Sequence, residues 1–138
     1  MSAQLVKRAA HATEAVTFVP IGRVKGDFDA QAMPEEIAAT ESHIVLDADL
    51  VEGLTGVEAG RQAMVIFHFH KIADYELLQH PRGDSARPKR GVFALHTPFR
   101  PNPIGVTVVD VLAVEGNILR VRGLDALDGS PVLDIKLV

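Results

Sequence analysis

The chain has 138 residues, of which 47% are hydrophobic and 23% charged, a balance typical of one soluble globular domain and not of a disordered or fibrous chain. The absence of cysteine excludes disulfide scaffolds, thiolate metal sites and thiol nucleophiles, and favours a cytoplasmic protein. The formal net charge of −4 argues against a broad basic surface that coats nucleic acid, and no apolar run is long enough to cross a membrane.

Short apolar runs rich in Val and Ile, separated by Gly, Pro and Asp, predict a chain made mainly of strands. The first strand is expected over residues 17–24, with Pro20 at a sheet edge or strand end, and the second over 41–46. Residues 54–61 are typical of a turn or a single helical turn. The clearest strand follows over 62–70, where alternate residues form one apolar face (Val65, Phe67, Phe69) and one face that ends in two histidines (Met64, Ile66, His68, His70).

The second half of the chain continues in the same way. Residues 79–90 predict a long surface loop. The elements expected after it are a short strand over 91–95, a turn-rich segment over 97–105, a hairpin of strands 106–114 and 118–123, and a last strand over 131–138. Short strands without crossover helices predict a mainly β fold, a single-sheet antiparallel β-barrel with short helical turns.

Charge is distributed unevenly along the chain. Residues 26–60 contain nine acidic side chains and neither Lys nor Arg. Residues 80–100 are basic instead, with Asp84 against Arg82, Arg87, Lys89, Arg90 and Arg100. Such runs are typical of solvated loops; the alternative for the basic one is that an anionic ligand such as a phosphate backbone docks beside it.

Several common catalytic motifs are missing. No G-x-G-x-x-G, P-loop, G-x-S-x-G or H-E-x-x-H sequence occurs, so nucleotide hydrolysis and serine hydrolysis have no support. The most suggestive pair is His68 and His70, because residues i and i+2 of a strand share a face, about 7 Å apart, where two imidazoles can share a metal ion. Candidates for a third ligand are His80, His96, Asp74 and Glu76. The alternative is one hydrogen-bonded and one exposed histidine.

Two further segments favour ligand binding. Residues 97–105 (TPFRPNPIG) contain three prolines that fix φ, so this loop holds Arg100 and Asn102 in a rigid form suited to grip a carboxylate, a phosphate or a nucleobase edge. Residues 124–131 (LDALDGSP) predict a turn whose amides and carbonyls are free for a ligand, with Asp125 and Asp128 as acceptors for a ribose or an ammonium group. The alternatives are a structural loop whose arginine caps nearby carbonyls and an ordinary turn.

Together these segments resemble the TsaA/TrmO-like, or YaeB-like, family of S-adenosylmethionine-dependent methyltransferases. The motifs that carry the resemblance are GVFALHTPFRPNPIG at 91–105, GLDALDGSPVLDIK at 123–136, FVPIG at 18–22 and VIFHFHK at 65–71. The resemblance covers nearly the whole chain from Phe18 onward. It implies an antiparallel β-barrel domain over residues 16–138 after a peripheral extension over 1–15, in a homodimer that binds S-adenosyl-L-methionine outside the Rossmann fold.

The resemblance also implies an activity and its site residues. The activity is methylation of N6 of threonylcarbamoyladenosine beside the tRNA anticodon, without a metal. The implied cofactor-binding residues are His70, Lys71, His96, Val106, Leu127, Asp128, Gly129, Ser130 and Pro131. Arg100 and Asn102 are expected to shape the methyl-transfer pocket. The residues expected to contact RNA are Arg82, Arg87, Lys89 and Arg90.

Two other functions remain open. One is a metal-dependent β-barrel enzyme that uses His68 and His70. The other is a module that binds a nucleoside without turning it over. Methyl transfer from a sulfonium needs alignment and exclusion of water rather than a metal, so stoichiometric metal in the purified protein would favour the first alternative.

Overall fold

The computed structural model describes residues 5–6, 14–27 and 34–138. They belong to two compact units: the barrel unit, within residues 18–69 and 105–138, and the loop unit, within residues 1–17 and 70–104. The peripheral extension expected over residues 1–15 lies mostly outside the described residues. In the described part of the chain, no helix is both long and apolar enough to cross a membrane.

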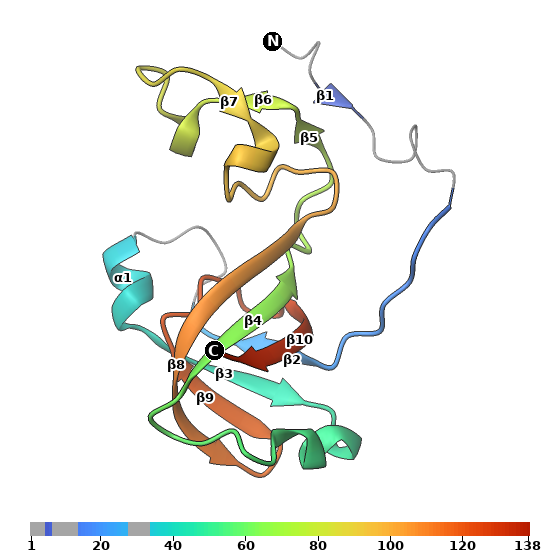
Figure 1. Cartoon of the computed structure of the whole chain (residues 1–138), viewed down its shortest axis with the longest axis vertical. Coiled ribbons are helices and arrows are strands. Elements are labelled where there is room, and N and C mark those ends of the chain that lie inside the picture. Colours follow the sequence, from blue (N-terminus) through green and yellow to red (C-terminus); the bar gives the residue numbers. More distant parts are fainter. Residues whose placement is uncertain (1–4, 7–13, 28–33) are drawn as a thin grey trace. The chain divides into compact units, whose positions relative to one another are not determined.

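A closed barrel of six strands forms the barrel unit (Figure 1). In order around the barrel, the strands are β10 (Pro131–Leu137), β2 (Gly22–Lys25), β3 (Glu41–Leu46), β9 (Ile118–Arg122), β8 (Ile104–Glu115) and β4 (Gln62–His68). Antiparallel pairing places Ile44 of β3 opposite Val24 of β2 and Leu119 of β9. The mainly β barrel predicted from the sequence is therefore confirmed.

Side chains that alternate along the strands fill the barrel. In β4, Val65 and Phe67 are buried whereas Met64 and Ile66 on the other face are half-buried, as the two-residue period of a strand predicts. The same alternation sends a set of apolar residues of the other strands into the core, including Val24, Ile44, Leu119, Val121 and Val132. Full burial of a side chain of this size contributes about 1.5–3 kcal/mol.

The hairpin between β8 and β9 turns at Gly116, as predicted. Its φ of +64° lies in the left-handed region that glycine adopts at little cost. Glu115 and Ile118 face each other across the turn. Asn117 joins the turn to the end of β3, because its Nδ2 donates to Leu46 O at 2.7 Å and its carbonyl accepts from the Leu46 N–H at 2.9 Å.

The start of the barrel differs from the prediction. The strand expected over 17–24 begins only at Gly22, since Pro20 has no N–H to donate to a ladder. The first bond to β10 is made by Ile21, whose N–H donates to Val132 O at 2.8 Å.

Two helical turns flank β3. The α-helix α1 (Pro34–Ala39) precedes it and begins with proline, which needs no N–H partner at that position. The 3-10 helix η3 (Ala48–Leu54) follows it and buries Leu54. Residues 54–61 were expected to form a turn or a single helical turn, and after Leu54 they form turns. The positive φ angles of Gly56 and Gly60 show why these residues form turns, because such angles do not belong to a right-handed helix.

The loop unit contains two short strand pairs. β1 (Leu5–Val6) pairs with β5 (Tyr75–Glu76), and β6 (Leu78–Gln79) pairs with β7 (Arg90–Gly91). The 3-10 helix η4 (Pro81–Gly83) lies between β6 and β7, and η5 (Val92–Ala94) follows β7. The strand predicted over 91–95 is wrong: the pairing with β6 ends at Gly91, and Val92 is buried at the start of η5 instead.

Candidate functional site

The turn from Leu127 to Pro131 lies in the barrel unit, directly before β10. Gly129 at its centre has a φ of +83°, which glycine adopts readily. The Gly129 N–H donates to Val24 O at 2.8 Å, and the Val24 N–H donates to Ser130 O at 3.0 Å. Within the turn, the Ser130 N–H donates to Leu127 O at 3.1 Å. Backbone hydrogen bonds therefore hold this turn against β2.

Two side chains strengthen the same attachment. Asp128 Oδ1 accepts from the Gly26 N–H at 3.2 Å, and Arg23 Nη1 donates to Gly129 O at 3.2 Å. The sequence left the amides of this turn free for a ligand, but those of Gly129 and Ser130 donate within the protein because they join the turn to β2. The contributions of Arg23 and Gly26 carry no signal in the sequence, since they lie more than 100 positions away from their partners. Asp128 is exposed, so its carboxylate can face a ligand.

Asp125 precedes this turn and lies between the buried residues Leu124 and Ala126. Burial raises the pKa of its carboxyl above the ordinary value. Carboxyls with raised pKa values are common at the margins of binding sites, so Asp125 remains a candidate acceptor.

The start of β8 presents Val106, which is 47% exposed. The preceding residue, Gly105, lies against two aromatic rings: a Cβ on it would be 2.6 Å from Phe67 Cζ and 2.7 Å from Phe69 Cζ. The rings meet edge to face with centroids 5.1 Å apart, a favoured arrangement. Only glycine lets the strand approach the rings this closely, and this packing positions Val106.

In the loop unit, Arg100 holds the proline-rich loop together. Its Nη1 donates to Leu95 O at 2.8 Å and to Thr97 O at 3.2 Å. Gln79 Nε2 donates to Phe99 O at 2.6 Å. The guanidinium thus caps carbonyls, which was the structural alternative for this residue. Asn102 in the same loop is exposed. A role in a transfer pocket stays a prediction for Arg100 and Asn102.

The expected cofactor-binding residues are divided between the two units. His70, Lys71 and His96 belong to the loop unit, where His70 is half-buried and the other two are exposed. His70 and Lys71 each have an interaction within the protein. Val106 and the turn 127–131 belong to the barrel unit.

The loop between β6 and β7 presents basic side chains to solvent. It is compact: Asp84 Oδ1 accepts from the Ala86 N–H at 3.0 Å, and His80 Nδ1 lies 2.7 Å from Arg87 O. The exposed basic residues are those expected from the sequence, Arg82, Arg87, Lys89 and Arg90. Three of these cations lie in the loop and Arg90 begins β7, and such a group of exposed cations is suited to phosphate contacts.

A metal centre finds no support in the described residues. Among them, no group of three or more His, Cys, Asp or Glu side chains is arranged to hold a metal ion. His68 is half-buried at the end of β4. The metal-dependent alternative therefore rests on the sequence spacing of His68 and His70 alone.

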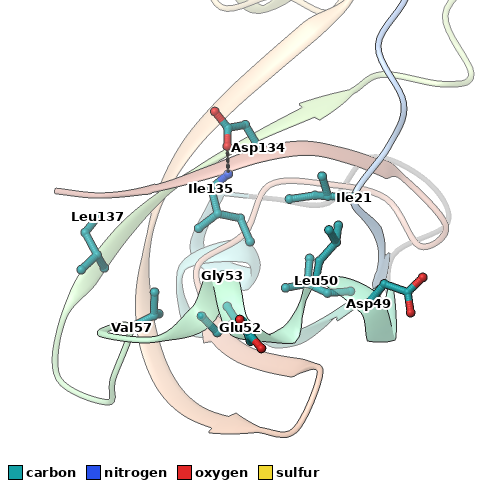
Figure 2. Close-up of a pocket in the computed structure, with 11 residues that line it drawn as sticks. Ile21, Asp49, Leu50, Glu52, Gly53, Val57, Asp134, Ile135 and Leu137 are labelled. Atoms are coloured by element: carbon teal, nitrogen blue, oxygen red, sulfur yellow. Dashed lines mark hydrogen bonds between the residues drawn. The ribbon is translucent and has the colours of Figure 1, made fainter.

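A cavity of about 470 Å³ opens in the barrel unit beside η3 and β10 (Figure 2). Its apolar lining consists of Ile21, Leu46, Leu50, Leu54, Val57, Ile135 and Leu137, and the residues Asp49, Glu52, Gly53 and Asp134 complete it. None of the site residues expected from the sequence belongs to this lining. The sequence carries no signal for the cavity, because its walls come from segments far apart in the chain.

Comparison with known protein sequences places these features in a family. The family model described as the tRNA-methyltransferase O N-terminal domain matches residues 24–137. A protein of Archaeoglobus fulgidus named S-adenosyl-L-methionine-binding protein is 42% identical over 120 residues, which cover 85% of this chain and 85% of that protein. A Mus musculus protein named tRNA (adenine(37)-N6)-methyltransferase is 42% identical over 86 residues, which cover 60% of this chain and 20% of that protein.

Solved structures show the same relationship. The crystal structure of TrmO from Pseudomonas aeruginosa is similar to this chain with a TM-score of 0.69 at 30% sequence identity. The similarity covers 91% of this chain and 56% of the Pseudomonas chain. Another crystal structure of TrmO gives a TM-score of 0.65 at 29% identity and is covered to 57%. The chain thus spans little more than half the length of these solved proteins.

Proposed function

The chain belongs to the family of the tRNA-methyltransferase O N-terminal domain, and we propose that it is an S-adenosyl-L-methionine-dependent methyltransferase that acts on an adenosine of tRNA. The observation that carries the proposal is the family match over residues 24–137, which includes the proline-rich loop and the turn 127–131. Relatives named for binding S-adenosyl-L-methionine support the cofactor. The name of the mouse relative, tRNA (adenine(37)-N6)-methyltransferase, supports an adenosine of tRNA as the methyl acceptor.

The residues at the expected cofactor positions suit the chemistry of S-adenosyl-L-methionine, which carries adenine, ribose, ammonium and carboxylate groups. The exposed carboxylate of Asp128 suits the ammonium group or a ribose hydroxyl, and the ammonium of Lys71 suits the carboxylate. Val106, which is exposed, and Leu127, which is half-buried, offer apolar surface to the adenine. The cofactor has no phosphate, which agrees with the absence of a glycine-rich phosphate loop.

When bound, S-adenosyl-L-methionine supplies a methyl group activated by the sulfonium. The task of the chain is then to hold the acceptor nitrogen in line and to exclude water. The proline-rich loop is suited to this task because Arg100 and Gln79 fix its shape through its carbonyls. The acceptor nitrogen must lose a proton, and histidine is the side chain whose ordinary pKa best matches this role near neutral pH.

We further propose that the acceptor is N6 of threonylcarbamoyladenosine beside the anticodon, and that the enzyme is a cytoplasmic homodimer. The mouse relative is named for N6 of adenine 37. An N6 that carries a threonylcarbamoyl group retains one N–H, which methylation replaces. Light scattering coupled to size exclusion tests the dimer: a monomer mass at micromolar protein would contradict it.

A single-turnover assay tests the proposed function. The protein is mixed with methyl-labelled S-adenosyl-L-methionine and with bulk tRNA from cells that lack this methyltransferase. We expect label in the tRNA, at an N6-methylated nucleoside after digestion. The matched substrate is bulk tRNA from cells that cannot make threonylcarbamoyladenosine. Equal labelling of both tRNA pools would refute that acceptor while keeping the methyltransferase.

The second candidate is a module that binds the cofactor without transferring its methyl group. Several relatives are named as binding proteins rather than enzymes, and this favours keeping the candidate. The same assay separates the two: binding of the cofactor with no label in any tRNA would establish the binding module.

A further inference from the structure

The strands β2, β3 and β9 are neighbours in the barrel (Figure 1), and basic side chains gather on their outer face. We call it the basic barrel face, and its side chains are Arg23, Lys25, His43, Arg120 and Arg122. They alternate with buried residues along each strand, such as Val24 in β2 and Ile44 in β3. They therefore point out of the barrel.

Strand register brings three of these side chains into one row. Lys25 of β2 is opposite His43 of β3, and His43 is opposite Arg120 of β9. Neighbouring strands lie about 4.8 Å apart, so the row spans about 10 Å. A row of this length can contact successive phosphates of one nucleic acid strand.

The concentration of positive charge on this face is unusual for the unit that carries it. The barrel unit contains fourteen Asp and Glu residues against six Lys and Arg, a formal charge of −8. Four of those six cations belong to the basic barrel face. Because the rest of the unit repels a polyanion, this face is where the barrel can accept one.

Two carboxylates offset part of this charge. Glu41 lies 3.5 Å from Arg120 Nε and 3.5 Å from Arg122 Nη2, and Glu115 lies 3.4 Å from Arg120 Nη1. These pairs are long and partly exposed to solvent, so they are weak, and each guanidinium has five N–H donors in all. The arginines can therefore also contact phosphate.

The strand β2 carries the uncompensated charge. Among the described residues, neither Arg23 nor Lys25 pairs with a carboxylate. Arg23 Nη1 instead donates to Gly129 O at 3.2 Å. One end of the basic barrel face thus adjoins the turn that is expected to bind the cofactor.

We infer that the basic barrel face binds the phosphate backbone of the RNA substrate. The inference rests on the proposed function for the identity of that RNA as tRNA, but binding can be measured without methyl transfer. RNA held on this face lies beside the turn 127–131, where the cofactor is expected. This face could not be recognised in the sequence, because its basic residues come from three segments between residues 23 and 122 and only the sheet brings them together.

The test compares two charge reversals in the same unit. Lys25→Glu changes an exposed residue of the basic barrel face, and Arg61→Glu is the matched control, an exposed cation of the barrel unit that is not on β2, β3 or β9. Affinity for bulk tRNA is measured by filter binding at several KCl concentrations. Affinity for S-adenosylhomocysteine, measured by calorimetry, and the melting temperature show whether either variant is damaged.

We expect Lys25→Glu to weaken tRNA binding about tenfold and to reduce the slope of log K against log [KCl] by about one. Arg61→Glu should stay within about twofold of the wild type, and both should bind S-adenosylhomocysteine normally. Unchanged tRNA binding by Lys25→Glu, equal weakening by Arg61→Glu, or no tRNA binding by the wild type would overturn the inference.

The failure of the proposed function gives a different result, in which the wild type binds tRNA but transfers no methyl group to it. If Lys25→Glu misfolds, Lys25→Ala with His43→Ala is measured by the same criteria.

Discussion

Gly105 of β8 lies directly against the ring of Phe67 of β4, so that a Cβ at this position would be 2.6 Å from Phe67 Cζ. This approach joins two strands of the barrel at the point where β8 begins. Phe67 is buried in the core and cannot move away freely. The glycine is therefore required by packing, and not by its backbone conformation.

Gly105→Ala should accordingly destabilise the protein by about 1–3 kcal/mol, the usual cost of overpacking a core. Urea denaturation measures the change in the free energy of unfolding. Gly53→Ala is the matched control in the same unit, because a Cβ there meets no atom within 4 Å. A Gly105→Ala protein as stable as the Gly53→Ala protein would show that the strands do not meet in this way.

Asp128 combines a structural bond with an expected cofactor contact, and two substitutions separate them. Asp128→Ala removes the acceptor of the Gly26 N–H and should weaken binding of S-adenosyl-L-methionine by about 1–3 kcal/mol. Asp128→Asn keeps a side-chain oxygen for Gly26 but loses the charge. If the carboxylate meets the cofactor's ammonium group, both variants bind weakly in calorimetry. Normal binding by both would show that Asp128 does not contact the cofactor.

The basic loop of the loop unit provides a third prediction. The double variant Arg87→Ala and Arg90→Ala should lower tRNA affinity and reduce the salt slope by up to about two, because each arginine that contacts a phosphate releases a counterion. Binding of S-adenosylhomocysteine should not change. An unaltered salt slope would show that these exposed arginines do not contact RNA.

Asp134 predicts a pH dependence of stability. The hydrogen bond from Lys136, whose Nζ lies 3.0 Å from Asp134 Oδ2, lowers the pKa of this carboxyl, and the Ile135 N–H acts in the same direction. A lowered folded-state pKa stabilises the protein above the ordinary pKa of 3.8, and this contribution is lost as the pH falls through the lowered value. Asp134→Asn should thus be less stable than the wild type at pH 7 by at most about 1 kcal/mol, and the difference should vanish in strong acid.

Asp125 is the opposite case. For both Asp134→Asn and Asp125→Asn, urea denaturation at several pH values measures the free energy of unfolding. Its raised pKa means that ionisation opposes folding, so the cost appears as the pH rises through the raised value. Asp125→Asn should therefore be more stable than the wild type at neutral pH and lose this advantage below the ordinary carboxyl pKa. The same sign of change for both variants at pH 7 would contradict the two assignments.

The barrel strands could be predicted from the sequence, but the structure of the segment 91–95 could not. The alternation in residues 62–68 predicted the inner face of β4 because strand period and burial follow directly from residue type. The Glu115–Asn117 turn was equally visible from its composition. The strand expected over 91–95 does not form, because its partner β6 has only two residues and offers no hydrogen-bonding positions beyond Gly91. The length of a partner strand cannot be read from the residues of 91–95 themselves.

In the candidate site, too, local motifs could be predicted from the sequence, whereas contacts between distant segments could not. Motif resemblance identified the turn 127–131, but the bonds from Arg23 and Gly26 that hold it come from strand β2 and its end, far away in sequence. The capping role of Arg100 was foreseen as an alternative, since a guanidinium beside several prolines finds carbonyls nearby. The row of Lys25, His43 and Arg120 could not be foreseen, because it depends on the register of three strands.

The central claim is that this barrel binds S-adenosyl-L-methionine, and calorimetric titration of the purified protein with S-adenosyl-L-methionine and S-adenosylhomocysteine tests it most directly. The account predicts micromolar binding of both ligands, with one site per chain. Absence of heat from either ligand at millimolar concentration, in protein whose unfolding transition is cooperative, would contradict it.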